Sequence, residues 1–234
     1  MRRLLCKTEG YYSICNRGAL NSKIFDTTAD YMRFLLCLKE FNTNENIDLR
    51  QVINYPKMQS QNIGAQPLPL VEIAAYCLLP EHYHIIVRQV AERGIPLFMK
   101  KLGTGFAMHV NSSRKTVGHI FQGSFIAREV QDIRELLFLS AYIHLEPIQK
   151  KSERVPDMKM NEAKLKKISE YPWSSIKEYL GLGAAFVDLT EIKNVKPRVN
   201  SLWIKNALGS QSYENYILNF WGKESNYPID KRFL

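Results

Sequence analysis

Long apolar runs are missing from this 234-residue sequence, and so are paired-cysteine motifs, internal repeats and low-complexity tracts. No apolar run approaches the roughly 18–20 residues that a membrane-spanning helix needs. The four cysteines show no C-x-x-C spacing, which favours small buried thiols over a disulfide framework or a zinc knuckle. Near the start, Leu4, Leu5 and Cys6 are too few for the apolar region of a signal peptide. We therefore expect a cytoplasmic protein with no membrane partner.

The composition is that of a soluble globular protein with a basic surface. Hydrophobic residues make up 45% of the chain, charged residues 24% and aromatic residues 11%, which is enough to build and anchor a core. The formal net charge of +9 suits a polyanionic partner, with nucleic acid as the first candidate. Charge alone leaves open that the chain is merely a soluble basic protein.

The order of the predicted elements indicates an α+β fold with an antiparallel central sheet and helices packed on it. Strands are predicted at Tyr11–Cys15, Val71–Leu79, His82–Val87 and, as a bent strand or hairpin, Gly118–Val130. Helices are predicted at Thr28–Phe41, at Ile95–Val110 and from a capping box at Asp132–Glu135 to near Glu146, where Pro147 stops the helix. We also expect a short strand within Ile47–Tyr55, a surface loop at 56–69 and a polar turn at Asn111–Thr116.

Two glycines fall inside the helix predicted at Ile95–Val110. Glycine is unfavourable in a helix interior by roughly 1 kcal/mol relative to alanine. Gly103 and Gly105 therefore predict either the close approach of another backbone or a break in the helix.

The chain is expected to divide near residue 150. Residues 1–150 would form the main domain, and residues 151–234 a linker followed by a small helical C-terminal extension. The Lys/Glu-rich stretch 149–170 suits a linker with some helix, Tyr171–Ser175 would cap a short helix through Leu180, and Val187–Val199 would begin the extension. Its aromatic residues would pack on each other or on the main domain: Trp203, Tyr213, Tyr216, Phe220 and Trp221.

Two histidines one residue apart mark the first candidate site. His82 and His84 lie in the stretch Y-C-L-L-P-E-H-Y-H-I-I-V, which is typical of a strand. Successive side chains of a strand point to opposite faces, so the two imidazoles share a face while Tyr83 and Ile85 point into a core. Two imidazoles on one face make half of a divalent-metal site, unless they are simply surface or hydrogen-bonded core histidines.

Glu146 and Tyr142 could complete that site from the end of a helix. A carboxylate at a helix C-terminus meets the negative end of the helix dipole, and a cation bound there would make the placement favourable. Two imidazoles and one carboxylate suit Mg²⁺, Mn²⁺ or a similar ion. Tyr142 lies four residues before Glu146, so the two side chains are neighbours on the helix surface. The alternatives are a solvated carboxylate and an ordinary amphipathic-helix tyrosine.

Four stretches together carry a resemblance to a known family. The segment L-P-E-H-Y-H-I-I-V resembles the histidine–hydrophobic–histidine motif of the HUH single-tyrosine transposases, most closely the REP-associated tyrosine transposases. The segments Y-Y-S-I-C-N-R-G, G-H-I-F-Q-G-S-F and A-Y-I-H-L-E-P-I resemble that family's first strand, its G-x-x-F/W-Q-x-x-F segment and its nucleophile helix, in the same order. The downstream Y-P-W-S-S also occurs in this family, and the resemblance covers roughly residues 8–180.

The resemblance implies an HUH endonuclease fold, ferredoxin-like or RRM-like, and cleavage and rejoining of single-stranded DNA near hairpins through a 5′-phosphotyrosine. By position, Tyr142 matches the nucleophile and His82 and His84 match the ligands of a divalent metal, Mg²⁺ or Mn²⁺. Glu146 stands where related enzymes have Asn, Gln or His, which is a departure from the family pattern. Ser124 and Ile126 are also departures, because relatives often have Arg and Lys there. The protein would act as a monomer or a homodimer.

Basic and polar side chains in several segments are candidates for DNA contacts, although each could be a solvated charge. They are Arg17, Lys100, Lys101, Arg114, Lys115, Gln122 and Arg128. Three other functions stay open: a catalytically retired module that binds nucleic-acid hairpins, a replication-initiator-type nickase, and a phosphodiesterase that uses water while Tyr142 is structural.

Overall fold

A computed structural model describes residues 6–54, 68–149, 160–182 and 197–219 of the chain. The strands are β1 (Tyr11–Arg17), β2 (Val71–Leu79), β3 (His82–Gln89) and β4 (Ile126–Glu129). The helices are α1 (Thr28–Glu40), α2 (Leu49–Asn54), α3 (Gly94–Arg114), α4 (Ile133–Leu145), α5 (Glu162–Glu170), α6 (Ile176–Tyr179), α8 (Leu202–Leu208) and α9 (Tyr213–Leu218). Two short 3₁₀ turns are η1 (Ala19–Asn21) and η3 (Glu146–Ile148).

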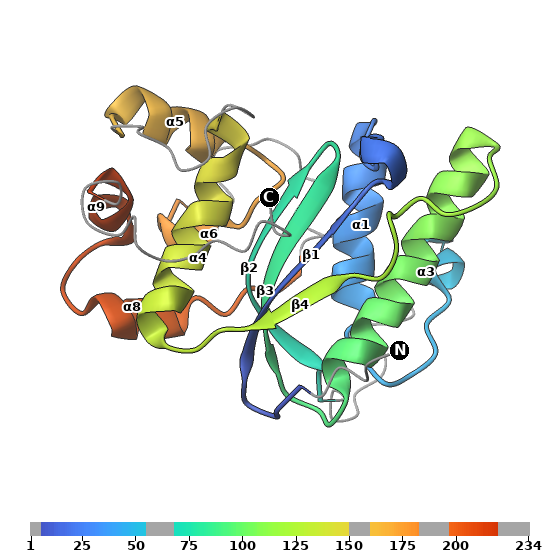
Figure 1. Ribbon diagram of the computed structural model, residues 1–234, viewed down its shortest axis with the longest axis horizontal. Helices are drawn as coiled ribbons and strands as arrows, with labels where there is room; N and C mark the ends of the chain where they lie inside the picture. The colour runs from blue at the N-terminus through green and yellow to red at the C-terminus, as the bar shows by residue number, and fades with distance from the viewer. Residues whose placement is uncertain (1–5, 55–67, 150–159, 183–196, 220–234) are drawn as a thin grey trace.

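The four strands form one antiparallel sheet in the order β2-β3-β1-β4. Because α1 connects β1 to β2 and α3 connects β3 to β4, the chain follows the β-α-β-β-α-β order of ferredoxin-like folds. Helices α1 and α3 cover one face of the sheet, and α4 lies on the other face with the C-terminal helices beside it (Figure 1). The predicted α+β class, with an antiparallel sheet and helices on its faces, is confirmed.

The core between the sheet and the α1–α3 face is built from large apolar side chains. A capping box starts α1, since the Thr27 hydroxyl accepts the Asp30 N–H and the Asp30 carboxylate accepts the Thr27 N–H. Tyr83 and Ile85 point from β3 into this core and are at most 1% exposed, as the alternation of the strand predicts. The predicted stripe of α1 is buried against them: Tyr31, Phe34, Leu35 and Leu38. Each fully buried side chain of this size stabilises the fold by about 1.5–3 kcal/mol.

The second core lies between the opposite face of the sheet and α4. Asp132 caps α4 by accepting the Glu135 N–H, but the Glu135 carboxylate accepts the N–H of Gln131 and not that of Asp132, so only half of the predicted capping box forms. The predicted stripe is buried, with Leu136, Leu139 and Ile143 at most 7% exposed. Regular α-helix ends at Leu145, and Pro147 lies in the η3 turn that follows. The predicted end near Glu146 is confirmed.

Three local predictions are wrong. Residues 49–54 form α2 and not a strand, because Asp48 caps them: its carboxylate accepts the Arg50 N–H and its carbonyl accepts the Val52 N–H. The helix predicted to end at Val110 continues through Arg114, whose guanidinium binds carbonyls outside the helix. Only Ile126–Glu129 of the predicted strand Gly118–Val130 pairs as a strand, and Phe121 makes a single bridge to Gly18.

Gly105 lies in α3 because the ring of Phe41 passes directly over it. A Cβ atom at Gly105 would lie 2.4 Å from Cε2 of Phe41, whereas a Cβ at Gly103 would meet nothing within 4 Å. The helix is unbroken at both positions. At Gly105 the close approach is therefore made by the Phe41 side chain from the end of α1. The two predicted explanations, a break in the helix and the approach of a second backbone, are both wrong.

The C-terminal aromatic residues pack both on each other and on the main domain. The ring of Trp203 lies 5.9 Å from that of Tyr11 in β1, and the rings of Tyr213 and Tyr216 lie 6.1 Å apart. Several predictions lie outside the described residues: positions 56–67 of the loop, 150–159 of the linker, 187–196 of the extension, and both Phe220 and Trp221. The division at residue 150 stays a prediction. Among the described helices, none is both long enough and apolar enough to cross a membrane.

Candidate metal centre

His82 and His84 begin β3, immediately after the tight turn at Pro80–Glu81. In the antiparallel register, Arg17 of β1 lies opposite His82, and Cys15 of β1 and Cys77 of β2 lie opposite His84 from its two sides. Directly opposed residues of an antiparallel pair project to the same face. The two imidazoles therefore stand on the α4 face of the sheet, with the His84 side chain 2% exposed and that of His82 26% exposed.

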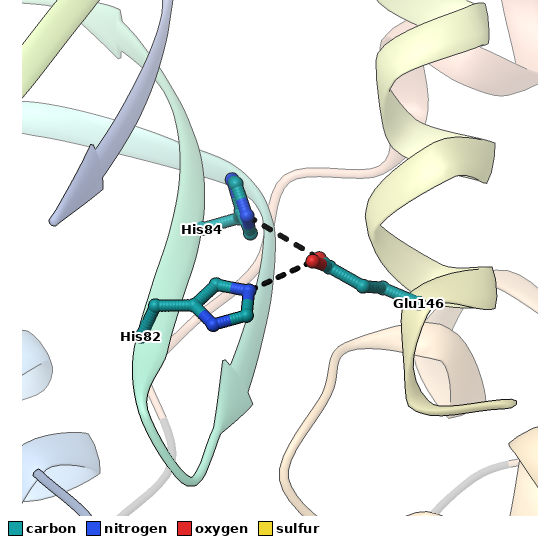
Figure 2. Close-up of side chains that lie close together, drawn as sticks. All are labelled: His82, His84 and Glu146. Carbon is teal, nitrogen blue, oxygen red and sulfur yellow. Dashed lines mark hydrogen bonds and ion pairs between the residues drawn. The ribbon is translucent and has the colours of Figure 1, made fainter. Parts of the chain in front are cut away.

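Glu146 reaches the two histidines from the residue directly after α4. Figure 2 shows the three side chains pointing toward one another, the histidines from the strand and the glutamate from the end of the helix. Nε2 of His82 donates to Oε1 of Glu146 over 2.7 Å, and Nε2 of His84 lies 3.3 Å from Oε2. Residues 64 positions apart in sequence thus meet in a partly buried cluster.

The charge of Glu146 is maintained by its two partners. Burial disfavours its ionised form, but the imidazoles of His84 and His82 outweigh burial and lower the pKa of the carboxyl to about 2. The carboxyl is therefore an anion at any physiological pH. A buried anion at the C-terminal end of a helix also opposes the helix dipole, so this position requires positive charge nearby.

This group could hold a metal ion, and two of its atoms fit such a role. One ligand atom from each of His82, His84 and Glu146 lies within 4.8 Å of the others. Nε2 of His84 and Oε2 of Glu146 are buried and face each other, yet neither makes a hydrogen bond of proper geometry within the described residues. Buried polar atoms are rarely left without partners, and a cation between these two would satisfy both. Two imidazoles and a carboxylate are a donor set for a divalent ion with positions left for further oxygen ligands.

Tyr142 lies one helical turn before Glu146 and packs against the same cluster. Its ring is perpendicular to that of His84, with 6.5 Å between the centroids. The side chain is nearly buried, at 4% exposed. Burial raises the pKa of Tyr142 well above the usual range of a phenol, and the Glu146 carboxylate raises it further. Tyr142 is therefore a neutral phenol at neutral pH unless a cation bound beside it offsets these effects.

Three of the predicted DNA contacts are occupied within the protein. The Lys101 ammonium donates to the carbonyls of Thr43 and Glu45. Arg114 donates to the carbonyls of Lys23 and Ile24 and to the Asp30 carboxylate, and Arg128 binds the Glu135 carboxylate. The bonds of Lys101 and Arg114 join segments that are distant in sequence, and that of Arg128 joins β4 to the first turn of α4. The three side chains therefore have structural roles that compete with binding a phosphate.

The other predicted contacts differ in their distance from the cluster. Arg17 lies beside His82 on the same face of the sheet, and its carbonyl accepts the N–H of Gln122, whose side chain is exposed. Lys100 and Lys115 are exposed but lie on or just after α3, which covers the opposite face of the sheet (Figure 1). The structure thus brings Arg17 to the cluster and leaves the two lysines away from it.

Sequence reasoning missed the neighbours that the cluster acquires through the sheet. Cys15 and Cys77 flank His84 only because of the strand register, which the sequence pattern does not specify. His144 was also missed. It is fully buried, with its two ring nitrogens bonded to the Tyr213 and Ser175 hydroxyls, and burial lowers its pKa to about 3. Its position two residues after Tyr142 on a predicted helix was the available signal.

Together, the fold and the cluster define an α+β protein with a possible His–His–Glu metal site. No family model matches the chain, and no curated protein matches it either. Among solved structures, it is similar to a REP-associated tyrosine transposase bound to a REP hairpin, with 16% sequence identity and a TM-score of 0.46. The similarity covers 78% of this chain and 86% of that one. At this identity and TM-score, we transfer neither the activity nor the ligand of that protein to this chain.

Proposed function

We propose that this chain is a metal-dependent enzyme that nicks and joins single-stranded DNA near hairpins, in the manner of a transposase, through a 5′-phosphotyrosine at Tyr142. The observation that carries the proposal is the meeting of His82, His84 and Glu146 in one partly buried cluster beside Tyr142. The four sequence motifs and the net charge of +9 support DNA as the substrate.

In this proposal the cluster holds Mg²⁺ or Mn²⁺. His82, His84 and Glu146 would supply three ligand atoms from one side, so the remaining positions face the substrate. A bound divalent cation would polarise the scissile phosphate and stabilise the charge that develops on it. The depressed pKa of Glu146 keeps its carboxylate ready for a cation throughout the physiological pH range.

Tyr142 is the proposed nucleophile. Its Oη forms a bond to phosphorus as the bond from phosphorus to the 3′ oxygen breaks. The phenol loses its proton, and the departing 3′ oxygen takes one up to become a free hydroxyl. The same hydroxyl, or another, can attack the phosphotyrosine in reverse and rejoin strands, so no external energy source is required. The raised pKa of Tyr142 means that deprotonation of the phenol is unfavourable unless a cation is bound beside it.

Arg17 is the proposed phosphate-holding residue closest to the cluster. It shares the sheet face with His82, directly across from it in β1. A guanidinium there can bind phosphate oxygens in a bidentate manner next to the reacting group. Gln122, whose N–H is bonded to the Arg17 carbonyl, remains a predicted DNA contact, as do Lys100 and Lys115 on the other side of the sheet.

The test is the formation of a covalent protein–DNA adduct. The full-length protein is incubated with 5′- and 3′-labelled hairpin DNA carrying single-stranded flanks, with Mn²⁺, with Mg²⁺ or with EDTA, and the products are separated on a denaturing gel. We expect an adduct that requires the metal and is lost in Tyr142→Phe and in His84→Ala.

Other outcomes point to the alternatives. Metal-dependent cleavage without an adduct, retained in Tyr142→Phe, indicates a phosphodiesterase that uses water. Hairpin binding without cleavage under all metal conditions indicates a retired binding module. Adduct formation on single strands that contain no hairpin favours the nickase of replication initiation. A chain that binds no DNA would contradict all of these functions.

A further inference from the structure

The turn that leaves β1 presents an apolar side chain to solvent in an unfavourable backbone conformation. Leu20, in η1, has φ 54° and ψ 33°, and Asn21 after it has φ 56°. Both residues are left-handed, which glycine and asparagine tolerate but leucine does not favour. Leu20 is 97% exposed, so no packing within the described residues compensates for this conformation.

The turn is held rigidly by its neighbours. The Gly18 N–H donates to the Glu81 carbonyl over 2.8 Å, and the Ala19 N–H donates to the Ile120 carbonyl over 2.9 Å. The Ser22 N–H closes the turn onto Ala19 over 3.0 Å. A Cβ at position 18 would lie 2.0 Å from the Ser22 carbonyl oxygen, so the chain packs too closely there for any side chain. Three segments thus fix a conformation that Leu20 alone would not adopt.

The turn lies beside the proposed metal site. Figure 1 shows it in dark blue next to the tip of the β2–β3 hairpin, where β3 begins with His82. Arg17 and His82 are opposite each other in the sheet, about 5 Å apart at Cα. Three residues span at most about 11 Å, so the Cα of Leu20 lies within about 16 Å of that of His82. That distance corresponds to about five nucleotide steps along a strand of DNA.

The surroundings of Leu20 are polar, with basic residues and acidic partners: Asp26 lies beside Lys23, and Asp30 binds Arg114. Arg17 lies three residues before it and Lys23 three residues after it, and the end of α3 reaches the same segment through the bonds of Arg114 to the Lys23 and Ile24 carbonyls. Lys23 lies 3.6 Å from Asp26, an exposed pair that water and salt screen strongly. Val117, three residues before Ile120, is also 97% exposed, but two single side chains are less than the apolar surface that a protein partner would be expected to meet. Isolated apolar side chains on a chain with a net charge of +9 suit nucleic acid.

We propose that Leu20 is a wedge that inserts between two bases where the paired stem of a DNA hairpin meets its single-stranded flank. This inference rests on the proposed function. Basic residues beside the turn would hold the phosphates, and Leu20 would replace the stacking contact between the two bases that it separates. The rigid turn serves this purpose because the wedge is placed before DNA binds. The strand leaving the stem would then be directed toward His82 and Tyr142.

The test uses full-length protein and hairpin DNA with 2-aminopurine at the stem–flank junction or, as a control, in the middle of the stem. Fluorescence of 2-aminopurine rises when the base is unstacked. The informative variant is Leu20→Asn, because asparagine keeps the left-handed turn and removes the apolar wedge. The matched control is Leu202→Ala, since Leu202 is 65% exposed in α8, away from the turn in Figure 1.

For the original chain and for Leu202→Ala, we expect a rise in fluorescence on binding at the junction and not in the stem. Leu20→Asn should lose that rise and bind about tenfold more weakly. Its melting temperature should equal or exceed that of the original chain, because asparagine tolerates the left-handed conformation better than leucine. Equal fluorescence and affinity in Leu20→Asn, with adduct formation intact, would overturn the wedge and leave the proposed function in place. Failure of the original chain to bind the hairpin at all would overturn both.

Discussion

Tyr142 and Tyr213 are buried in the same core, and replacing either one by phenylalanine removes only a hydroxyl. We nevertheless expect opposite effects of the two substitutions on stability and on adduct formation. Tyr142 is 4% exposed, and within the described residues its hydroxyl makes no hydrogen bond. Tyr213 is 5% exposed, and its hydroxyl is bonded to Ser140 over 3.1 Å and to His144 over 2.9 Å. The pair separates a chemical role from a structural one with the same one-atom change.

The magnitudes follow from those contacts. Tyr142→Phe removes no hydrogen bond between described residues, so the free energy of unfolding should change by less than about 1 kcal/mol. Tyr213→Phe leaves Nδ1 of the buried His144 without its partner and removes the bond to Ser140, whose hydroxyl still donates to the Leu137 carbonyl. It should lower the free energy of unfolding by about 1–3 kcal/mol. For a chain of this size, 1 kcal/mol shifts the melting temperature by about 2–4 °C. Tyr142→Phe should therefore melt within about 4 °C of the original chain, and Tyr213→Phe up to about 12 °C below it.

The assay combines thermal denaturation with the covalent adduct on labelled hairpin DNA at a temperature where every variant is folded. We expect Tyr142→Phe to be stable and form no adduct, and Tyr213→Phe to be less stable and form one. An adduct in Tyr142→Phe would refute the role of Tyr142 as nucleophile. A melting temperature of Tyr142→Phe as low as that of Tyr213→Phe would refute the reasoning from hydrogen bonds.

Three further predictions test the metal site, the packing of α3 and the capping of α1. Mn²⁺ at a concentration of 100 times its dissociation constant should stabilise the chain by about 2.7 kcal/mol, which raises the melting temperature by roughly 5–11 °C. EDTA and the variant Glu146→Ala should each abolish this rise. A rise that Glu146→Ala retains would contradict the proposed ligand set. Gly103→Ala should raise the free energy of unfolding by about 0.5–1 kcal/mol, whereas Gly105→Ala should lower it by about 1–2 kcal/mol because the new methyl group overlaps Phe41. Urea denaturation measures both changes, and equal effects would contradict the close packing of Phe41 on Gly105. Burial opposes ionisation of Asp30, but the hydrogen bonds from backbone amides and from the Arg114 guanidinium outweigh burial and lower its pKa in the folded state. The ionised Asp30 therefore contributes its full stabilisation of the fold above about pH 4, and this contribution is lost as the pH falls through the lowered pKa of the folded state. Asp30→Asn should flatten this acid limb of the stability profile, and an unchanged limb would exclude Asp30 as its source.

The parts of the fold set by local pattern could be predicted from sequence. The alternation of His82–Val87 placed two imidazoles on one face and Tyr83 in the core, because strand geometry alone determines that separation. Pro147 fixed the end of α4 and so the position of Glu146. The meeting of these two segments was a hypothesis from the chemistry of the three side chains and from the family resemblance, since no local rule specifies which helix end meets which strand.

What the sequence did not specify depends on contacts between distant segments. Lys101, Arg114 and Arg128 were predicted to face DNA, yet each binds oxygens of the protein itself, and a charge in a sequence gives no direction to its side chain. The strand predicted within Ile47–Tyr55 is an error of another kind, because the signals for α2 are local. Leu49, Val52 and Ile53 recur at helical spacing, and the Asp48 carboxylate caps the helix.

The 64-residue separation between His82 and Glu146 also determines when the cluster can exist during synthesis. A ribosome that adds about 5–20 residues per second needs roughly 3–13 s to pass from the histidine to the glutamate. During that interval the nascent chain carries a pair of imidazoles without their anion, and the cluster must then wait for α4 to emerge and dock. A chain still attached to a ribosome that has stalled between these two codons would therefore lack a complete cluster, so the order of translation itself delays assembly of the cluster until the second core has formed.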